Sequence, residues 1–297
     1  MTPIQRRTAL KILAAGAAGA AAGGVAQAAE GELPLPPNAV GLLYDSTRCI
    51  GCRACVTWCK RANELPDDEM VLNGAPYNAP LDLSATTKNI IRLAKDGERT
   101  AFVKAGCMHC LEPACANACM VSALTKNPST GVVEYDSSLC IADRYCQVAC
   151  PFNVPKYQWS KALTGKIVKC ELCRHLPEGP ACARVCPRQA MVTGKVVDLK
   201  AEANRRLARQ PGVYHPQVYG ERQVGGTQVL YLAPAAMPPE KLGLPEVGDE
   251  AIPTLSHVVH GGIYKAGVAP IALYTAFAFV VWRNRRRRSE PTKEDKT

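Results

Sequence analysis

Along most of the chain, apolar residues occur in short runs that predict strands and loops in place of long helices. Residues 89–93 and 101–104 each have the length and composition of a strand, and so does 225–232. Asp198 is placed to cap a helix over 199–210, which should stop at the Pro-Gly pair that follows. The pattern therefore predicts an α+β fold.

Two segments have the residues of a β-hairpin. In 125–136, turn residues at 127–131 precede an alternating strand. Further along, 191–193 and 196–197 flank a Gly-Lys pair, so a second hairpin is expected there. This repetition predicts that the chain contains duplicated modules.

The N-terminal residues 1–28 have the pattern of a twin-arginine export signal. Arg6 and Arg7 precede a weakly apolar Ala/Gly stretch, and a small-residue A-x-A site ends at Ala28. An alanine-rich helix is the simpler alternative, but it explains neither the paired arginines nor the A-x-A site. We expect cleavage after Ala28.

The C-terminal residues 263–282 approach the roughly 20 apolar residues that a transmembrane helix requires. The basic tail 283–297 follows at once, and such clusters stay on the cytoplasmic side of a membrane. A buried core helix is the alternative, which the adjacent arginines disfavour. The pattern thus predicts one anchoring helix with a cytoplasmic C-terminus.

Composition and charge narrow the picture further. Hydrophobic residues make up 47% of the 297 residues but aromatic residues only 6%, so a core built on aromatic packing is not expected. Most of the net charge of +10 lies in the signal and the tail, which leaves only +3 for 29–282. That balance is too small to indicate a nucleic-acid partner, and the basic tail is explained by topology and anionic lipid head groups.

All fifteen cysteines lie in four runs between the signal and residue 187. We therefore divide the chain into a cysteine-rich domain over 29–198 and a wrapping extension over 199–262, followed by the anchor and the tail. The runs have the forms C-x2-C-x2-C-x3-C, C-x2-C-x4-C-x3-C, C-x2-D-x2-C-x3-C and C-x2-C-x8-C-x3-C. In chain order they are Cys49, Cys52, Cys55 and Cys59; Cys107, Cys110, Cys115 and Cys119; Cys140, Asp143, Cys146 and Cys150; and Cys170, Cys173, Cys182 and Cys186.

This spacing is typical of ligands to cubane iron–sulfur clusters, since each iron needs one thiolate and short intervals direct the sulfurs to one side of the cube. The last cysteine of such a run goes to the other cluster of a two-cluster module, so the four runs are expected to work in pairs. Disulfides are disfavoured by the odd number of cysteines. Zinc accepts C-x2-C pairs but does not require the further cysteines at x2 and x3.

Several stretches resemble the HybA type of periplasmic iron–sulfur subunit found in hydrogenase-2 complexes. They are L-Y-D-S-T-R-C-I-G-C-R-A-C-V-T-W-C, C-M-H-C-L-E-P-A-C, R-Y-C-Q-V-A-C-P-F-N-V-P-K-Y and Y-G-E-R-Q-V-G-G-T-Q-V-L-Y-L, and the likeness covers nearly the whole chain. The cysteine runs alone are shared with a wider family that serves formate dehydrogenases and other molybdenum enzymes. The signal together with the single C-terminal helix favours the hydrogenase member. The resemblance implies two duplicated bacterial ferredoxin-like dicluster modules with loop-rich insertions.

The resemblance also implies a nested pairing, in which the first run works with the fourth and the second with the third. His109, inside the second run, is expected to donate a hydrogen bond near cluster sulfur and not to ligate iron. The implied ligand groups are Cys49, Cys52, Cys55 and Cys186; Cys59, Cys170, Cys173 and Cys182; Cys107, Cys110, Cys115 and Cys150; and Cys119, Cys140 and Cys146 with Asp143 at the fourth corner.

Asp143 departs from the family pattern because it stands where a cysteine is expected. Its carboxylate either ligates the fourth iron or leaves that corner vacant so that a three-iron cluster forms, and a loop-capping role is compatible with the second case. The expected cofactors are three [4Fe-4S] clusters and one [3Fe-4S] cluster, or a fourth [4Fe-4S] cluster ligated by Asp143.

The function that the resemblance implies is electron transfer. Electrons from the small and large subunits of a [NiFe] hydrogenase would pass through these clusters to an integral membrane quinone-reactive subunit. The twin-arginine export machinery would place the cluster domain in the periplasm, at the inner membrane. Two alternatives stay open: the same relay serving a formate dehydrogenase or other molybdoenzyme, and a zinc-stabilised membrane scaffold without electron transfer. No residue has the setting of a catalytic acid, base or nucleophile.

Overall fold

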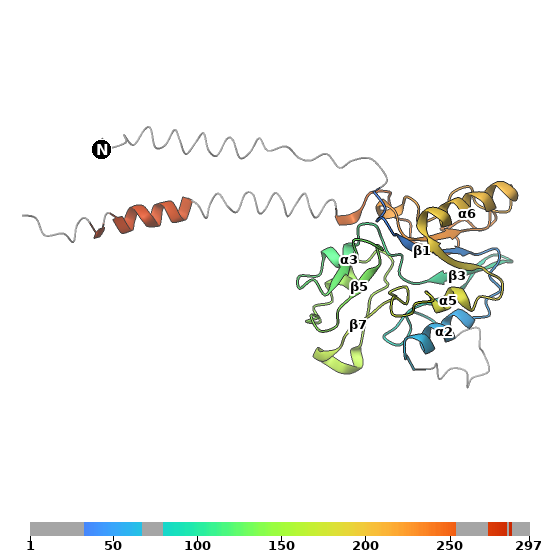
Figure 1. The fold of residues 1–297 in the computed structure, drawn as a ribbon, viewed down its shortest axis with the longest axis horizontal. Coiled ribbons are helices and arrows are strands. Elements are labelled where there is room, and N and C mark those ends of the chain that lie inside the picture. Colours follow the sequence, from blue (N-terminus) through green and yellow to red (C-terminus); the bar gives the residue numbers. More distant parts are fainter. Residues whose placement is uncertain (1–32, 67–79, 254–272, 284, 287–297) are drawn as a thin grey trace, which may run out of the picture. The chain divides into compact units, whose positions relative to one another are not determined.

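The computed structural model describes residues 33–66, 80–253, 273–283 and 285–286. These belong to two units, of which Glu30–Pro253 is one, and the other combines Met1–Ala29 with Thr254–Thr297. The predicted export signal and the first half of the predicted membrane span, 263–272, lie outside the described residues. Residues 273–283 form a helix (red in Figure 1). Within the part of the chain that is described, none of the helices has the length and apolar character needed to span a bilayer.

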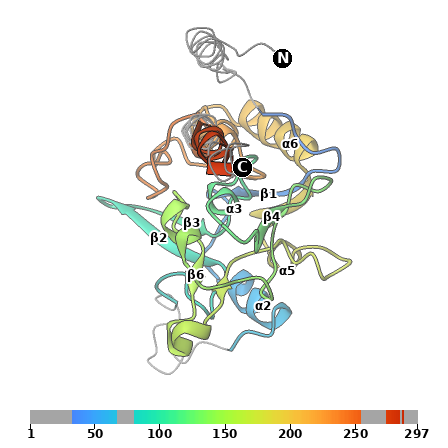
Figure 2. The same ribbon diagram turned by 90° about the vertical axis from the view of Figure 1, so that its left-hand side faces the viewer.

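A three-stranded sheet lies at the centre of the unit Glu30–Pro253. Its middle strand, β1 (Val40–Asp45), pairs antiparallel with β8 (Met191–Lys195) and parallel with β9 (Val229–Leu232). Helix α6 (Val196–Arg209) packs on one face of this sheet, as Figures 1 and 2 show. The other face packs against the core that supports the cysteine runs, so the sheet separates α6 from them.

The sequence pattern did not predict β1, which has the residues V-G-L-L-Y-D. The strand is buried on both faces, and a strand in that position is apolar throughout and does not alternate. The predicted strand over 225–232 is shorter in the structure, since Gln223–Gly225 form the 3-10 helix η3 and only β9 is extended.

The second predicted hairpin is wrong. Strand β8 continues through Gly194, which pairs with Gly41 of β1, and the chain enters α6 at Val196 without reversing. Burial explains the difference, because Val196 is fully enclosed and its amide donates to the Ala39 carbonyl. Asp198 consequently lies in the first turn of α6 and does not cap it.

The first predicted hairpin is confirmed: β4 (Leu124–Lys126) pairs antiparallel with β5 (Val133–Tyr135). The predicted strands near 89–93 and 101–104 are also present. They are longer than expected and pair with each other as β2 (Ile90–Asp96) and β3 (Arg99–Ala105). The remaining short elements are β6 (Lys156–Tyr157), the 3-10 helix η2 (Trp159–Thr164) and β7 (Ile167–Val168).

Each cysteine run carries one short helix. These helices are α2 (Ala54–Ala62), α3 (Ala114–Asn117), α4 (Tyr145–Ala149) and α5 (Ala181–Arg184). Helix α2 packs against α5, and α3 packs against α4. The first run therefore lies beside the fourth, as the neighbouring helices α2 and α5 show in Figure 1, and the second run lies beside the third.

The backbone repeats one turn at three of the four runs. The residue three positions after the last cysteine has a left-handed conformation, with φ of 53° at Ser122, 51° at Asn153 and 47° at Gln189. In each case its amide donates to the carbonyl of that cysteine, at 3.2, 3.1 and 3.1 Å. Non-glycine residues adopt this conformation rarely, so its recurrence at equivalent positions is the structural trace of duplicated modules.

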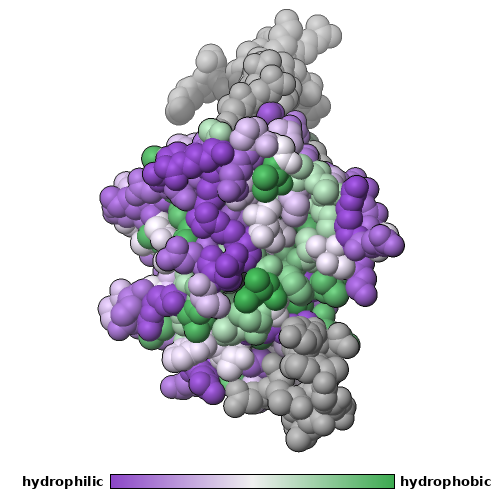
Figure 3. Space-filling view, turned by 90° about the vertical axis from the view of Figure 1, so that its right-hand side faces the viewer, coloured by the Kyte–Doolittle hydropathy of each residue, from purple (hydrophilic) through white to green (hydrophobic). Residues whose placement is uncertain are grey.

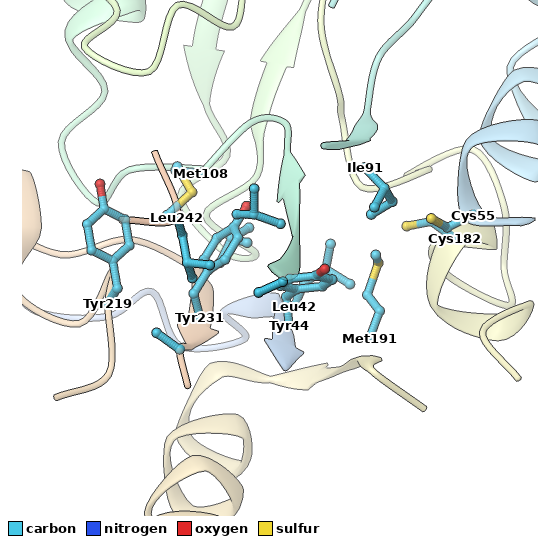
Figure 4. Close-up of a cluster of buried hydrophobic side chains, with 14 of the residues drawn as sticks. Leu42, Tyr44, Cys55, Ile91, Met108, Cys182, Met191, Tyr219, Tyr231 and Leu242 are labelled. Atoms are coloured by element: carbon cyan, nitrogen blue, oxygen red, sulfur yellow. The ribbon is translucent and has the colours of Figure 1, made fainter. Parts of the chain in front are cut away.

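The core contains more aromatic packing than the composition predicts. Tyr44 and Tyr231 are among the largest fully buried side chains, and their ring centroids lie 5.4 Å apart. Tyr219 meets Tyr231 edge-on at 6.1 Å. Figure 4 shows these rings beside Leu42. Few aromatic residues suffice because they are concentrated where β1 and β9 face the cysteine runs.

A buried ion pair joins α6 to the end of β1. Arg206 Nη1 donates to Asp45 Oδ2 at 2.9 Å, and the Tyr214 hydroxyl donates to the same oxygen at 3.0 Å. Asp45 is completely buried, and Thr47 donates to its other oxygen through both its amide and its hydroxyl. Because both charges are desolvated, removing Asp45 leaves Arg206 with the more exposed Glu202 as its ionic partner.

We expect Asp45→Asn to lower the free energy of unfolding by about 3 kcal/mol, the low end for a broken buried pair, because Glu202 still contacts Arg206. The thermal midpoint of the cluster-loaded protein, followed by visible absorption, measures the effect. Asp96→Asn is the matched control, since its pair with Lys241 at 2.7 Å is exposed and screened by solvent, so its loss should leave the midpoint almost unchanged. Equal midpoints for the two variants would contradict the role of the buried pair.

Candidate functional site

The structure gathers the cysteines into four groups, each with three ligand candidates from one run and one from its partner run. The evidence is that the pKa of one thiol in each group, Cys55, Cys59, Cys115 or Cys146, is raised by other members of the same group. We number these groups as sets. Set 1 is Cys49, Cys52, Cys55 and Cys186; set 2 is Cys59, Cys170, Cys173 and Cys182; set 3 is Cys107, Cys110, Cys115 and Cys150; set 4 is Cys119, Cys140, Cys146 and Asp143.

Set 1 surrounds a small pocket between the loop after β1 and the end of α5. All four of its cysteines line that pocket, together with Tyr44 and Met191. Burial raises the pKa of Cys55 to about 12, and the other three thiols add to the increase. Burial also raises the pKa of Cys49, although hydrogen bonds from the Tyr44 hydroxyl and the Gly51 amide oppose it. Cys52 is exposed, so set 1 lies at the surface.

Set 2 is held together by Asn63, which follows α2. The side-chain amide Nδ2 of Asn63 lies 3.8 Å from the Cys59 sulfur and 3.9 Å from the Cys173 sulfur. Lys88 Nζ donates to the other atom of this amide, Oδ1, at 2.8 Å and so fixes its orientation. Burial raises the pKa of Cys59 to about 11, with Cys170 and Cys173 contributing. Sequence reasoning missed Asn63, which has no special spacing from a cysteine.

Set 3 is largely enclosed, with Cys107 and Cys115 buried. Burial raises the pKa of Cys107 to about 11 and that of Cys115 to about 12. Burial likewise raises the pKa of Cys150, against the opposing effect of hydrogen bonds from the amides of Phe152, Asn153 and Val154. Amides that donate to a sulfur in this way stabilise a thiolate over a thiol.

Set 4 replaces one thiol by the carboxylate of Asp143. Burial raises the pKa of Cys146 to about 12, and Asp143 is the largest charged contributor, followed by Cys119 and Cys140. Asp143 Oδ1 accepts a hydrogen bond from the Tyr145 amide at 3.3 Å. Its other oxygen, Oδ2, is buried and has no hydrogen-bond partner among the residues that the structure describes. A buried carboxylate oxygen needs a partner, and a cation at this corner would supply one.

His109 is completely buried within the second run. Its Nδ1 accepts a hydrogen bond from the Val133 amide at 3.0 Å, which places the imidazole proton on Nε2. Burial, together with Lys169, Lys126 and Lys104, holds the pKa of His109 well below its usual value, so the ring is neutral. Nε2 has no partner in the described part of the protein. A donor is thus available inside the second run, as expected for a residue that hydrogen-bonds to cluster sulfur.

The loops between the cysteines share a left-handed backbone. Gly51 and Arg53 adopt it in the first run, His109 in the second, and Ala142 and Arg144 in the third. Successive residues in such conformations turn their amides toward one side and form a concave site for an anion. Gly51 also has no room for a side chain, because a Cβ atom there would overlap the Phe102 ring.

The four sets follow one another in space. Cys55 of set 1 lies close enough to Cys182 of set 2 to raise the pKa of that thiol, and Figure 4 shows these two sulfurs side by side. In the same way, Cys170 of set 2 contributes to the raised pKa of Cys107 in set 3. Cys146 of set 4 contributes to the raised pKa of Cys115 in set 3. The sets therefore form a row in the order 1, 2, 3, 4.

The donor chemistry of these sets fits iron–sulfur clusters. Thiols with a pKa near 11 or 12 stay protonated at neutral pH unless a bound cation draws them into the thiolate form. In the described residues, no three His, Cys, Asp or Glu side chains converge closely enough to hold a single metal ion directly. Ligands of a cubane bind separate corners, so they do not share one ion.

Comparison with known proteins identifies one family and a number of similar chains. The family is described as a 4Fe-4S dicluster domain and matches residues 99–196. The "Hydrogenase-2 operon protein HybA" of Escherichia coli O157:H7 is 38% identical over 88% of this chain and 89% of its own length. The nitrate-inducible formate dehydrogenase iron–sulfur subunit of Escherichia coli K12 is 32% identical, over 78% and 79%. The formate dehydrogenase iron–sulfur subunit of Haemophilus influenzae is 30% identical, over 77% and 79%.

Proposed function

The chain belongs to the HybA family of iron–sulfur proteins, and from that premise we propose that it relays electrons between a periplasmic [NiFe] hydrogenase and a quinone-reactive subunit in the membrane. The observation that carries this proposal is the row of four cysteine sets, each adjacent to the next. A row suits conduction, because every site then has a neighbour on the way through the protein.

The protein's own residues hold and insulate this row. Clusters bound at the four sets supply one-electron redox steps. The cysteine sulfurs fix their positions, and burial of Cys107, Cys115 and Cys182 excludes water from the interior sites. The amides of Gly51 and His109, in the left-handed loops, donate to the sulfurs of Cys49 and Cys107 and stabilise negative charge there. Asn63 and His109 add side-chain donors near sets 2 and 3.

Both ends of the row reach the surface amid hydrophobic side chains. Near set 1, Ile50 and Trp58 are exposed, and near set 4, Met120, Ile141 and Val148 are exposed. Figure 3 shows hydrophobic surface between hydrophilic areas on the face that lies to the right in Figure 1. Exposed apolar patches rimmed by polar residues are typical of protein contacts. Two such ends support one partner that delivers electrons and another that removes them.

The identity of the catalytic partner has one alternative. Two of the relatives are formate dehydrogenase subunits, and their likeness extends over more than three quarters of this chain. The HybA relative is more similar and covers more of the chain, which supports the [NiFe] hydrogenase small and large subunits as the partner.

The location of the protein is part of the proposal. The twin-arginine pattern in 1–28 supports export of the folded, cluster-loaded chain, and the apolar stretch 263–282 with its basic tail supports an anchor with a cytoplasmic C-terminus. The cluster domain would then lie in the periplasm, at the inner membrane.

We expect the affinity-purified chain, taken anaerobically from membranes, to contain iron and to bring nickel with it. Metal analysis of the complex and identification of the co-purified subunits measure this. Molybdenum with a molybdopterin subunit would replace the hydrogenase by a molybdoenzyme as the partner. Stoichiometric zinc without iron or visible cluster absorption would contradict electron transfer altogether and leave a zinc-stabilised scaffold.

We propose that the four sets hold three [4Fe-4S] clusters and, at set 4, a cluster whose fourth corner is occupied by Asp143 or vacant. The buried, unpartnered Oδ2 supports the occupied state, in which Asp143 ligates the fourth iron. A vacant corner gives the [3Fe-4S] cluster instead, with Asp143 bound only to the Tyr145 amide.

The expected result for Asp143→Asn is a three-iron signal in electron paramagnetic resonance of anaerobically prepared protein that is stronger than in the unsubstituted protein, because the anionic ligand is lost. Asp143→Cys should abolish that signal by completing the thiolate set. Asp136→Asn is the control, since this exposed carboxylate contacts only the nearby loop through Ser138. A three-iron signal of equal intensity in the unsubstituted protein and the Asp143→Asn variant would show that Asp143 does not ligate iron.

A further inference from the structure

Three lysines, two of them buried and one largely enclosed, lie among the cysteine sets, whereas the buried Lys60 donates to the Pro66 carbonyl. Lys104 lies on β3 and is 1% exposed, and Lys169, just before Cys170, is 2% exposed. Lys126 ends β4 and is largely enclosed. Lysine is rarely buried without a partner, because the ammonium loses its hydration. Three of them in one small interior therefore require a common explanation.

Within the described part of the chain, none of the three pairs with a carboxylate. Lys126 Nζ donates to the carbonyls of Cys110 and Gly131, at 2.8 and 3.0 Å, and to the Gln228 side chain at 3.1 Å. Lys169 Nζ donates to the carbonyls of Val133 and Cys170. Neutral carbonyls solvate an ammonium but do not neutralise it, so the balancing negative charge has to come from elsewhere.

Lys104 lies between sets 1 and 2. Its ammonium interacts electrostatically with Cys55 of set 1 and with Cys170 and Cys182 of set 2. Burial alone would lower the pKa of Lys104, but Tyr231 and these thiols reverse the effect and raise it. The backbone makes room for the ammonium at Gly106, where a Cβ atom would lie 2.6 Å from Lys104 Nζ. The next residue is Cys107, the first cysteine of set 3.

Set 4 has a different electrostatic environment. The groups that raise the pKa of Cys146 electrostatically are Asp143, Cys119 and Cys140, and none of them is cationic. Lys166, which is partly exposed, contacts the carbonyl of Cys140 at 3.4 Å. Lys104, Lys126 and Lys169 instead oppose the rise in the pKa of cysteines in sets 1 to 3. Interior positive charge is therefore distributed unevenly along the row.

We propose that the Lys104 ammonium is a shared counter-charge for the clusters of sets 1 and 2, and that it raises the reduction potentials of both. Each one-electron reduction makes a cluster more negative by one charge. A fixed positive charge beside it stabilises the reduced form more than the oxidised form, and low-dielectric surroundings strengthen the effect. Lys104 is thus a positioning residue for charge, and it binds no substrate. This inference rests on the proposed ligand sets.

The test is a redox titration of the full chain with its clusters assembled, monitored by electron paramagnetic resonance. Cys52→Ser, Cys173→Ser and Cys110→Ser first assign the signals of sets 1, 2 and 3. Lys104→Met should lower the reduction potentials of sets 1 and 2 by at least about 59 mV each. For a one-electron couple this corresponds to a tenfold change in the equilibrium constant of reduction. The reduction potential of set 4 should not change.

Three further variants separate charge from packing. Lys169→Met removes a buried lysine that interacts with Cys107 and Cys115 and also contacts the carbonyl of Cys170 in set 2, so it should shift the potential of set 3 and leave that of set 1 unchanged. Lys241→Met removes an exposed lysine paired with Asp96 and should shift none. Lys104→Arg keeps the charge and should restore the potentials of sets 1 and 2 toward those of the unsubstituted protein.

Unchanged potentials of sets 1 and 2 in Lys104→Met would overturn the proposal, and so would equal shifts of all four sets. If Lys104→Met fails to assemble its clusters, Lys104→Arg decides: assembly with near-normal potentials supports the counter-charge, and failure of both variants overturns it. Iron analysis of the unsubstituted protein keeps the two levels apart. Absence of iron there contradicts the proposed function, whereas normal clusters with unchanged potentials contradict only the role of Lys104.

Discussion

Negative charge gathered in a dry interior is the constraint on which this structure depends. Fifteen thiols and one carboxylate converge in four sets, and burial together with mutual repulsion raises the pKa of Cys55, Cys115 and Cys146 to about 12. Such an arrangement is unfavourable unless cations occupy it. Three features can balance this negative charge: bound iron, backbone amides of the left-handed loops, and buried lysines. The fold is therefore completed by what it binds, as in other proteins whose metal-binding free energy contributes to folding.

The surrounding fold keeps the sets at fixed separations. Strand β1 leads directly into the first run, and β8 and β9 pair with it on either side. Below this sheet, Tyr44 and Tyr231 pack against Leu42, Met191 and the cysteine helices. The ion pair between Asp45 and Arg206 fastens α6 over the opposite face. Since electron transfer depends on distance, a rigid scaffold of this kind serves the proposed relay better than a mobile one.

The duplication is visible at three levels. Similar cysteine spacings recur, short helices pair as α2 with α5 and α3 with α4, and the same left-handed turn follows the last cysteine of three runs. The copies have nevertheless diverged in charge. Lys104, Lys126 and Lys169 act on sets 1 to 3, whereas Asp143 brings a carboxylate into set 4. One repeated backbone can thus hold sites with different electronic properties, because side chains around the sulfurs change without disturbing the turns.

The sequence by itself determined the chemistry, because cysteine spacing reflects the geometry of the group that is bound. It also revealed the hairpin over 125–136 and the unusual Asp143, which are local features of a few residues. It failed where distant segments decide the structure. Strand β1 was missed because it is buried on both faces, and Gly194 was taken for a turn because its pairing with Gly41 is not visible locally. Only the tertiary structure placed Lys104 between two sets and left Asp143 Oδ2 without a partner among the described residues, since burial and counter-charge come from residues far away in the chain.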